Sequence, residues 1–366
     1  MIKPAERKSN FDLMRILCIL LIIMFHYTMH GGFLYLDYAP QKYFYGVTGI
    51  WGLLGVLGFI TVSSHFLYSR GSFSVQKILR IIFEASFYPT LITIVLYLAG
   101  LIDISNIYIF ECIFSPFIRQ YWFITDYIIF YLLTPFLKFF CDRISTEKQK
   151  MLLIVLFFVI FPLSDITHVN SFSKLGIFVY IYILIAYFIR KPDNFFQKHY
   201  KLLSVIVFGL TISLSCLLIY LCHVTNDDKF ITRILEMSEL TSTLMFLSAV
   251  CLYFIFKNMN LGYSKILYFI GGSTLAVYLI HEHGYLHYIL FDRLLKRYEV
   301  YNLAWGPLIF ILSCAGVLLA CSLIHNCISF IFRKTIYSLT DKYLKKRYEA
   351  FDSKYVPSQE RSSGSR

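Results

Sequence analysis

The stretch MRILCILLIIMFH, residues 14–26, is an apolar run with an arginine near one end and a histidine at the other. Comparable runs recur along the chain of 366 residues, of which 58% are hydrophobic and 15% charged. A bilayer core about 30 Å thick requires runs of about 20 apolar residues, whereas a soluble domain needs far more polar surface. The sequence therefore predicts an all-α, polytopic bundle with about ten membrane-spanning helices.

Ten apolar segments are candidate spans. They cover residues 11–30, 46–68, 79–100, 121–139, 151–166, 174–190, 201–222, 236–256, 266–283 and 304–331. An even number of spans places both termini on one side. Basic residues concentrate at the N-terminus, in the even-numbered loops and after Phe332, which predicts a multi-pass protein of the cell membrane with cytoplasmic termini.

One segment disagrees with this orientation. FDRLLKRYEV (291–300) places Arg293, Lys296 and Arg297 on the predicted outer side. Either this segment is an interfacial helix on that side, or the ninth span is misplaced.

Charge and cysteine content exclude other classes of protein. The net charge of +12 does not indicate nucleic-acid binding, because the basic residues lie mostly in short loops between apolar segments. The nine cysteines are scattered without a CxxC pair, so we expect neither a disulfide framework nor a zinc site of that type. Residues 1–335 are predicted to form one transmembrane domain and residues 336–366 a basic, partly disordered cytoplasmic tail.

Arg15 and His26 are predicted to share one face of the first span. Two side chains eleven positions apart on a helix point in directions that differ by only about 20°, and they lie about 16.5 Å apart along the axis. His30 continues the same face. Taken singly, Arg15 could snorkel to lipid headgroups and His26 could be a hydrogen-bonded packing residue. An arginine suits phosphate binding and a histidine suits proton transfer. Because both lie on one face of the helix, the pair predicts one pathway through the protein.

At this point the chain resembles a known family. An arginine, ten residues and a histidine in the first span are similar to the signature of the membrane acyltransferase 3 family, whose members transfer acyl groups, usually acetyl, onto cell-surface polysaccharides and related acceptors. Four further segments resemble family motifs in the same order: GVLGFITVSSHFLYSR (55–70), KILRIIFEASFYPTL (77–91), YWFITDYIIFYLLTPFL (121–137) and GGSTLAVYLIH (271–281). Two positions depart from the family pattern. Ser64 stands where glycine is usual, and Lys77 replaces an arginine and so lacks its bidentate fork.

The resemblance implies an integral-membrane O-acyltransferase that uses acetyl-CoA or another acyl-CoA as donor and a polysaccharide or glycolipid as acceptor. His26 would be the general base, or else the nucleophile that carries the acyl group. Arg15, Lys77 and Arg80 would bind the phosphates of the donor at the cytoplasmic face. Without the resemblance, Lys77 and Arg80 are ordinary loop charges, and Glu84 is expected to pair with Arg80 at i,i+4.

Other residues are assigned to the acceptor side. Arg119, Tyr121, Trp122 and Asp126 cluster at the outer start of the fourth span, where aromatic residues are either interfacial anchors or a platform for a sugar ring. Asp126 lies within the apolar stretch and is expected to pair internally or face a cavity. The family element makes His281 a site residue near the outer face.

The segment HEHGYLH (281–287) suggests a metal, since His283 and His287 are four positions apart. It does not match HExxH, because position 285 is tyrosine, and another metal site would need further ligands. We therefore expect no metal. The competing function is a transporter or flippase for a polar or anionic solute, with Arg15, His26 and Asp126 as substrate or proton-relay groups.

Overall fold

The computed structural model describes residues 8–31, 33, 41–70, 74–118, 120–167, 173–225, 227 and 229–332. Within these ranges every regular element is a helix, as the sequence predicts. Seven helical stretches of this part are long and apolar enough to cross a membrane, so a membrane bundle is supported and the count of ten is not confirmed. The tail predicted at 336–366 lies outside the described residues.

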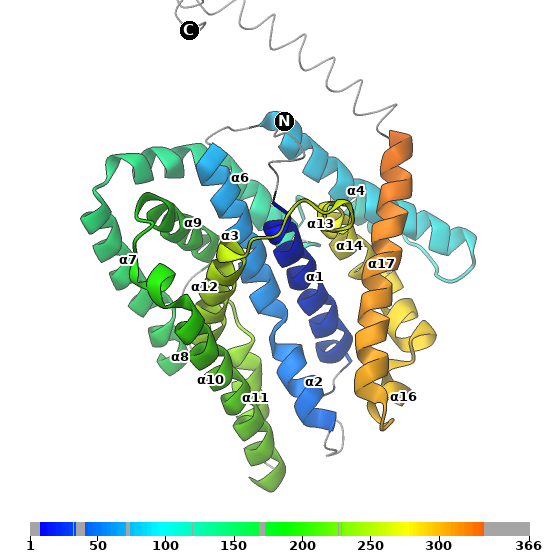
Figure 1. Cartoon of the computed structure of the whole chain (residues 1–366). Coiled ribbons are helices and arrows are strands. Elements are labelled where there is room, and N and C mark those ends of the chain that lie inside the picture. Colours follow the sequence, from blue (N-terminus) through cyan, green and yellow to red (C-terminus); the bar gives the residue numbers. More distant parts are fainter. Residues whose placement is uncertain are drawn as a thin grey trace, which may run out of the picture.

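Helix α1 (Asn10–Met29) occupies the centre of the bundle. It contacts α2 (Gln41–Ile50), α3 (Gly52–Arg70) and a set of elements from the C-terminal half of the chain. That set comprises α12 (Thr243–Asn258), α13 (Lys265–Gly272), α14 (Thr274–His281) and α17 (Gly306–Phe332). In Figure 1 the start of α1 and the end of α17 lie at the same end of the bundle.

The remaining long helices flank this centre on two sides (Figure 1). On one side lie α7 (Thr146–Ile160), α8 (Pro162–Thr167), α9 (Lys174–Arg190), α10 (Phe195–Thr225) and α11 (Lys229–Met237). On the other side, α4 (Val75–Leu98) contacts α5 (Asn106–Ile113) and α14. Helix α6 (Trp122–Arg143) contacts α3, α4 and α9, and thus joins the two sides.

Several predicted spans are divided in the structure. The segment 46–68 is the pair α2–α3, which meets at Trp51, and 151–166 is the pair α7–α8, which meets at Phe161 just before a proline. The segment 236–256 begins later, at Thr243, because the Ser242 side chain accepts a hydrogen bond from the backbone N–H of Met245 and caps α12.

The ninth predicted span, 266–283, is two short helices that meet at Ser273. The break lies two residues after Gly271, where a Cβ would sit 3.1 Å from Cβ of Asp12 on α1. After α14 the chain forms α15 (Gly284–Tyr288), a π-helical turn η3 (Ile289–Leu294) and α16 (Arg297–Tyr301). The anomalous segment 291–300 is therefore not a single interfacial helix, and Arg297 within it is fully buried.

Helices α1 and α3 approach closely along a stripe of glycines at Gly52, Gly55 and Gly58. A Cβ on Gly55 would collide with the carbonyl oxygen of Cys18, and one on Gly58 would collide with the Cys18 sulfur. Small residues at such crossings allow backbones to pack against each other where water contributes no driving force. This stripe holds α1 at a defined depth in the bundle.

We predict that Gly55→Ala destabilises the protein. The added methyl has no space against α1, and overpacking of this kind costs about 1–3 kcal/mol, which exceeds the gain in helix propensity of about 1 kcal/mol. The matched control is Gly316→Ala on α17, where no neighbouring atom lies within 4 Å of the new Cβ. Thermal unfolding of the detergent-solubilised protein should show a lower midpoint for Gly55→Ala alone; equal midpoints would contradict the assignment.

Candidate functional site

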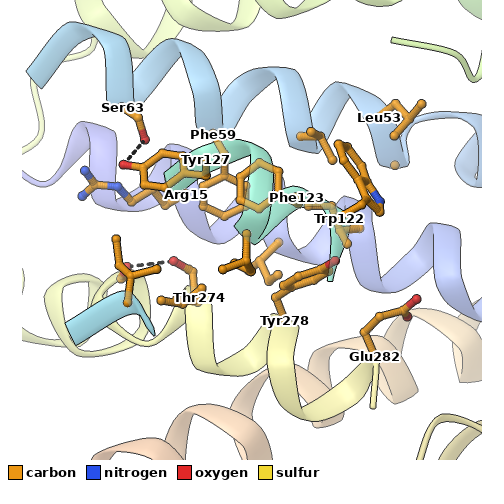
Figure 2. Close-up of a pocket in the computed structure, with 18 of the residues that line it drawn as sticks. Arg15, Leu53, Phe59, Ser63, Trp122, Phe123, Tyr127, Thr274, Tyr278 and Glu282 are labelled. Carbon is orange, nitrogen blue, oxygen red and sulfur yellow. Dashed lines mark hydrogen bonds between the residues drawn. The ribbon is translucent and has the colours of Figure 1, made fainter. Parts of the chain in front are cut away.

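A cavity of about 380 Å³ extends along α1 in the middle of the bundle. Figure 2 shows Arg15 at one end and Glu282 at the other, with the aromatic rings of Phe59, Phe123 and Tyr127 between them. Lys77 in the first turn of α4 also lines the cavity. Helix α3 runs antiparallel to α1 and therefore ends on the Arg15 side. Because α4 follows α3, it begins on that side as well. The cavity is thus apolar in its middle and carries cations at one end and a carboxylate at the other.

The predicted face of α1 is the face that borders this cavity. Arg15, Ile19, Ile22 and His26 all line it, at spacings of four, three and four residues. The guanidinium of Arg15 donates from Nη1 to Oδ1 of the buried Asp12 at 3.2 Å. Arg15 is therefore paired with an acidic residue one turn earlier in the same helix.

His26 meets two residues at the end of α14. Its Nδ1 lies 2.7 Å from Oε2 of Glu282 and 3.0 Å from Nε2 of His281. Only 8% of the His26 surface is exposed and none of His281. A buried histidine next to a carboxylate is the arrangement that orients an imidazole for proton transfer.

The hydrogen bonds assign the tautomer of both rings. Nδ1 of His281 lies 2.6 Å from the carbonyl oxygen of Val277, which can only accept, so this nitrogen carries the proton and Nε2 carries the lone pair. Nδ1 of His26 faces that lone pair and the Glu282 carboxylate, and therefore carries its own proton. In the neutral ring of His26 the lone pair is then on Nε2, which is the state that a general base needs.

Two further histidines surround Glu282. Nε2 of His30 lies 3.9 Å from Glu282 Oε1, and Nδ1 of His287 lies 3.6 Å from Glu282 Oε2. His283, the other histidine of this segment, points elsewhere and contacts Thr93 Oγ1 at 2.9 Å through its Nε2.

The structure separates the other predicted donor-side residues. Lys77 lines the cavity, with its Nζ 5.0 Å from the centre of the Tyr131 ring. Arg80 is not among the lining residues, and its Nε donates to Glu84 Oε1 at 2.8 Å, which is the i,i+4 pair expected from the sequence.

The predicted acceptor-side residues are also divided. Trp122 lines the cavity and lies under Nζ of Lys174, which is 3.8 Å from the ring centre. Tyr121 is buried and donates to the carbonyl oxygen of Leu279 at 3.2 Å, while Asp126 is buried in α6 outside the cavity lining. Arg119 lies outside the described residues.

Sequence reasoning missed Glu282 and Arg297. Glu282 follows His281 directly, so an acidic residue at the end of an apolar run was a signal for it. Arg297 is fully buried and donates to the carbonyl oxygens of Tyr27 at 3.3 Å and His30 at 3.2 Å. Its signal was the disagreement of the loop 291–300 with the charge pattern of the other loops.

Arg297 closes the C-terminal end of α1 beside the site. The last carbonyls of a helix have no partner within it, and a buried cation satisfies them and the helix dipole together. Asp292 forms an ion pair with Nε of Arg297, and Tyr301 donates to the same Tyr27 carbonyl at 2.7 Å. This clamp ties the end of α1 to the segment that follows His287.

We predict that Arg297→Ala strongly destabilises the protein. It removes the partner of Asp292 and of the His30 carbonyl, and breaking a buried ion pair costs about 3–5 kcal/mol. Arg297→Lys keeps the charge without the planar fork and should be intermediate. Arg293→Ala, at an exposed position four residues earlier, is the control and should change stability by less than about 0.5 kcal/mol. Chemical or thermal unfolding in detergent measures all three; similar stability of Arg297→Ala and Arg293→Ala would refute the clamp.

Comparison with known proteins gives one match. The profile of the acyltransferase 3 family, described as an acyltransferase domain, matches residues 8–326. No curated protein and no solved structure matches the chain. The matched range includes α1, the whole cavity lining and the segment with Glu282.

Proposed function

The chain belongs to the acyltransferase 3 family of membrane acyltransferases, and from this premise we propose that it moves an acetyl group from cytoplasmic acetyl-CoA to a hydroxyl of a cell-surface polysaccharide or its precursor. The observation that carries the proposal is the single cavity that joins Arg15 and Lys77 to His26 and Glu282. An acyl-CoA carries phosphates at one end and a thioester at the other. The cations at one end of the cavity suit the phosphates, and the imidazole beside a carboxylate at the other end suits the thioester.

The donor is proposed to lie along α1. Arg15 and Lys77 bind the phosphates of coenzyme A by charge-assisted hydrogen bonds. Eleven helical residues rise about 16.5 Å, a distance comparable with the extended pantetheine arm, so the thioester reaches His26. The apolar lining from Ile19, Ile22 and Phe59 suits an arm that carries few charged groups.

The reaction is proposed to use His26 as the general base. Nε2 takes the proton of the acceptor hydroxyl while its oxygen attacks the thioester carbonyl carbon. The C–S bond then breaks, coenzyme A leaves as the thiol after taking a proton from Nε2, and an ester remains on the acceptor. Glu282 stabilises the imidazolium that forms in between and holds Nδ1–H in place.

The acceptor is proposed to enter at the Glu282 end. Trp122 and Tyr278 both line the cavity, and Figure 2 places them near that end. Aromatic faces of this kind pack against the apolar face of a sugar ring. In this arrangement the acceptor meets the base from the side opposite the donor phosphates, and the Arg15 end faces the cytoplasm.

The transporter alternative draws on the same charged residues, since a carboxylate beside an imidazole also suits a proton relay. Membership in a family of acyltransferases favours group transfer over solute transport. Counterflow of an intact solute through reconstituted protein, without any ester product, would favour the transporter instead.

We predict that His26→Ala abolishes acetyl transfer and that Glu282→Gln lowers kcat by about 10²–10⁴-fold with the KM for acetyl-CoA unchanged. Glutamine keeps the size of the side chain but cannot stabilise the imidazolium. His199→Ala, at an exposed histidine on α10, is the control and should be fully active. Purified protein in membranes with labelled acetyl-CoA and polysaccharide acceptors measures the rates; an active His26→Ala would remove the assignment.

We predict that Arg15→Gln and Lys77→Gln raise the KM for acetyl-CoA about 10-fold or more, because each removes a charge-assisted contact worth about 1.5–3 kcal/mol. Lys148→Gln, an exposed lysine in the first turn of α7, controls for general surface charge and should leave the KM unchanged. A raised KM for acetyl-CoA in Arg80→Gln would mean that the donor phosphates extend beyond the cavity. Equal KM values for Arg15→Gln and Lys148→Gln would contradict the donor site.

A further inference from the structure

Four side chains that could coordinate a metal ion lie near one another at the Glu282 end of the cavity. His26, His30 and Glu282 offer one potential ligand atom each, and these atoms lie within 4.8 Å of one another. The ring of His287 lies 4.8 Å from the ring of His30, and its Nδ1 is 3.6 Å from the Glu282 carboxylate. Two imidazoles and one carboxylate therefore face a common point, and the His287 ring lies beside the same carboxylate.

His287 supplies an independent observation. Only 4% of its surface is exposed, yet Nε2 has no hydrogen-bond partner within the described part of the chain, and Nδ1 reaches only as far as 3.6 Å from the Glu282 carboxylate. Buried polar groups are almost always satisfied, because an unsatisfied one costs about 1–3 kcal/mol. A side chain of this kind, directed at a carboxylate and two other imidazoles, indicates that something binds between them.

We propose that His26, His30, His287 and Glu282 form a binding site for a divalent transition-metal ion of the Zn²⁺ class, and that the ion inhibits acyl transfer. Three imidazoles and a carboxylate are a donor set that Zn²⁺ accepts, whereas Mg²⁺ and Ca²⁺ prefer oxygen ligands alone.

The spacing fits after small movements of the side chains. Ligands about 2.0–2.1 Å from a tetrahedral Zn²⁺ lie about 3.3 Å apart. The separations from the carboxylate are near this value, with His26 and His287 at 2.7 Å and 3.6 Å from Glu282 Oε2 and His30 at 3.9 Å from Oε1, and the ligand atoms of His26, His30 and Glu282 lie within 4.8 Å of one another. His26 and His30 are four positions apart on α1, the spacing with which two histidines of one helix share a metal. Since 42% of the His30 side chain is exposed, an ion has a path into the site.

Inhibition follows from the tautomer of His26 and rests on the function proposed above. An ion bound at Nδ1 displaces the proton there and leaves Nε2 as the protonated nitrogen. An ion bound at Nε2 occupies its lone pair directly. In both cases His26 loses the lone pair that would accept the proton of the acceptor, and Glu282 is diverted from the imidazole to the ion.

Metal binding is tested with Zn²⁺ on the purified full chain, in competition with a chromophoric chelator. We expect one tightly bound Zn²⁺ per chain and no displacement by excess Mg²⁺. Loss of a residue that only supports a metal ligand weakens binding about 10–100-fold. His30→Ala and His287→Ala should weaken Zn²⁺ binding by more than this, while His199→Ala should bind as the wild type does. Failure of the wild type to compete with the chelator, or unchanged binding in both variants, would overturn the site.

Inhibition is tested in the transfer assay. Wild-type activity should fall in proportion to Zn²⁺ occupancy and return with EDTA, and His30→Ala should be active and need more than 10-fold higher Zn²⁺ for the same loss. Loss of activity with EDTA alone would overturn inhibition, because the ion would then be required. If the chain transfers no acetyl group under any condition, the proposed function fails, whereas the chelator titration still decides the metal site.

Discussion

The contact between Nδ1 of His26 and the Glu282 carboxylate is the interaction on which the candidate site depends. It joins the first helix to the end of α14, two segments separated by more than half of the chain, and the same nitrogen meets His281 at a separation of 255 residues. The contact requires that α1 lies at one depth and that α14 ends beside its last turn. The glycine stripe of α3 sets the first condition, and the clamp of Arg297 on the carbonyls of Tyr27 and His30 supports the second.

Periodicity and hydropathy predict the helical membrane architecture and the face of α1 that lines the cavity. The phase of Arg15 and His26 depends only on the regular geometry of a helix, and both side chains line one cavity in the structure. The boundaries of α9 agree with the predicted segment 174–190, where Ser173 caps the helix. Local rules are sufficient in these places, because the neighbours along the chain determine the outcome.

Interactions between distant segments are what the sequence does not reveal. The break between α13 and α14 arises where Gly271 meets Asp12, a contact that no pattern within residues 266–283 contains. Similarly, the spacing of four positions groups His283 with His287, whereas the fold turns His283 to Thr93 and His287 to Glu282. Arg297 has the appearance of a loop cation in sequence and becomes a helix cap only when the end of α1 is beside it.

The aromatic middle of the cavity bears on the electrical insulation of the bilayer. Phe59, Phe123 and Tyr127 separate the charged groups at the two ends (Figure 2). A continuous file of water between those ends would conduct protons down their gradient, and apolar narrow sections of pores prevent this by excluding water. We therefore expect the aromatic middle of the cavity to disfavour proton conduction between its two charged ends.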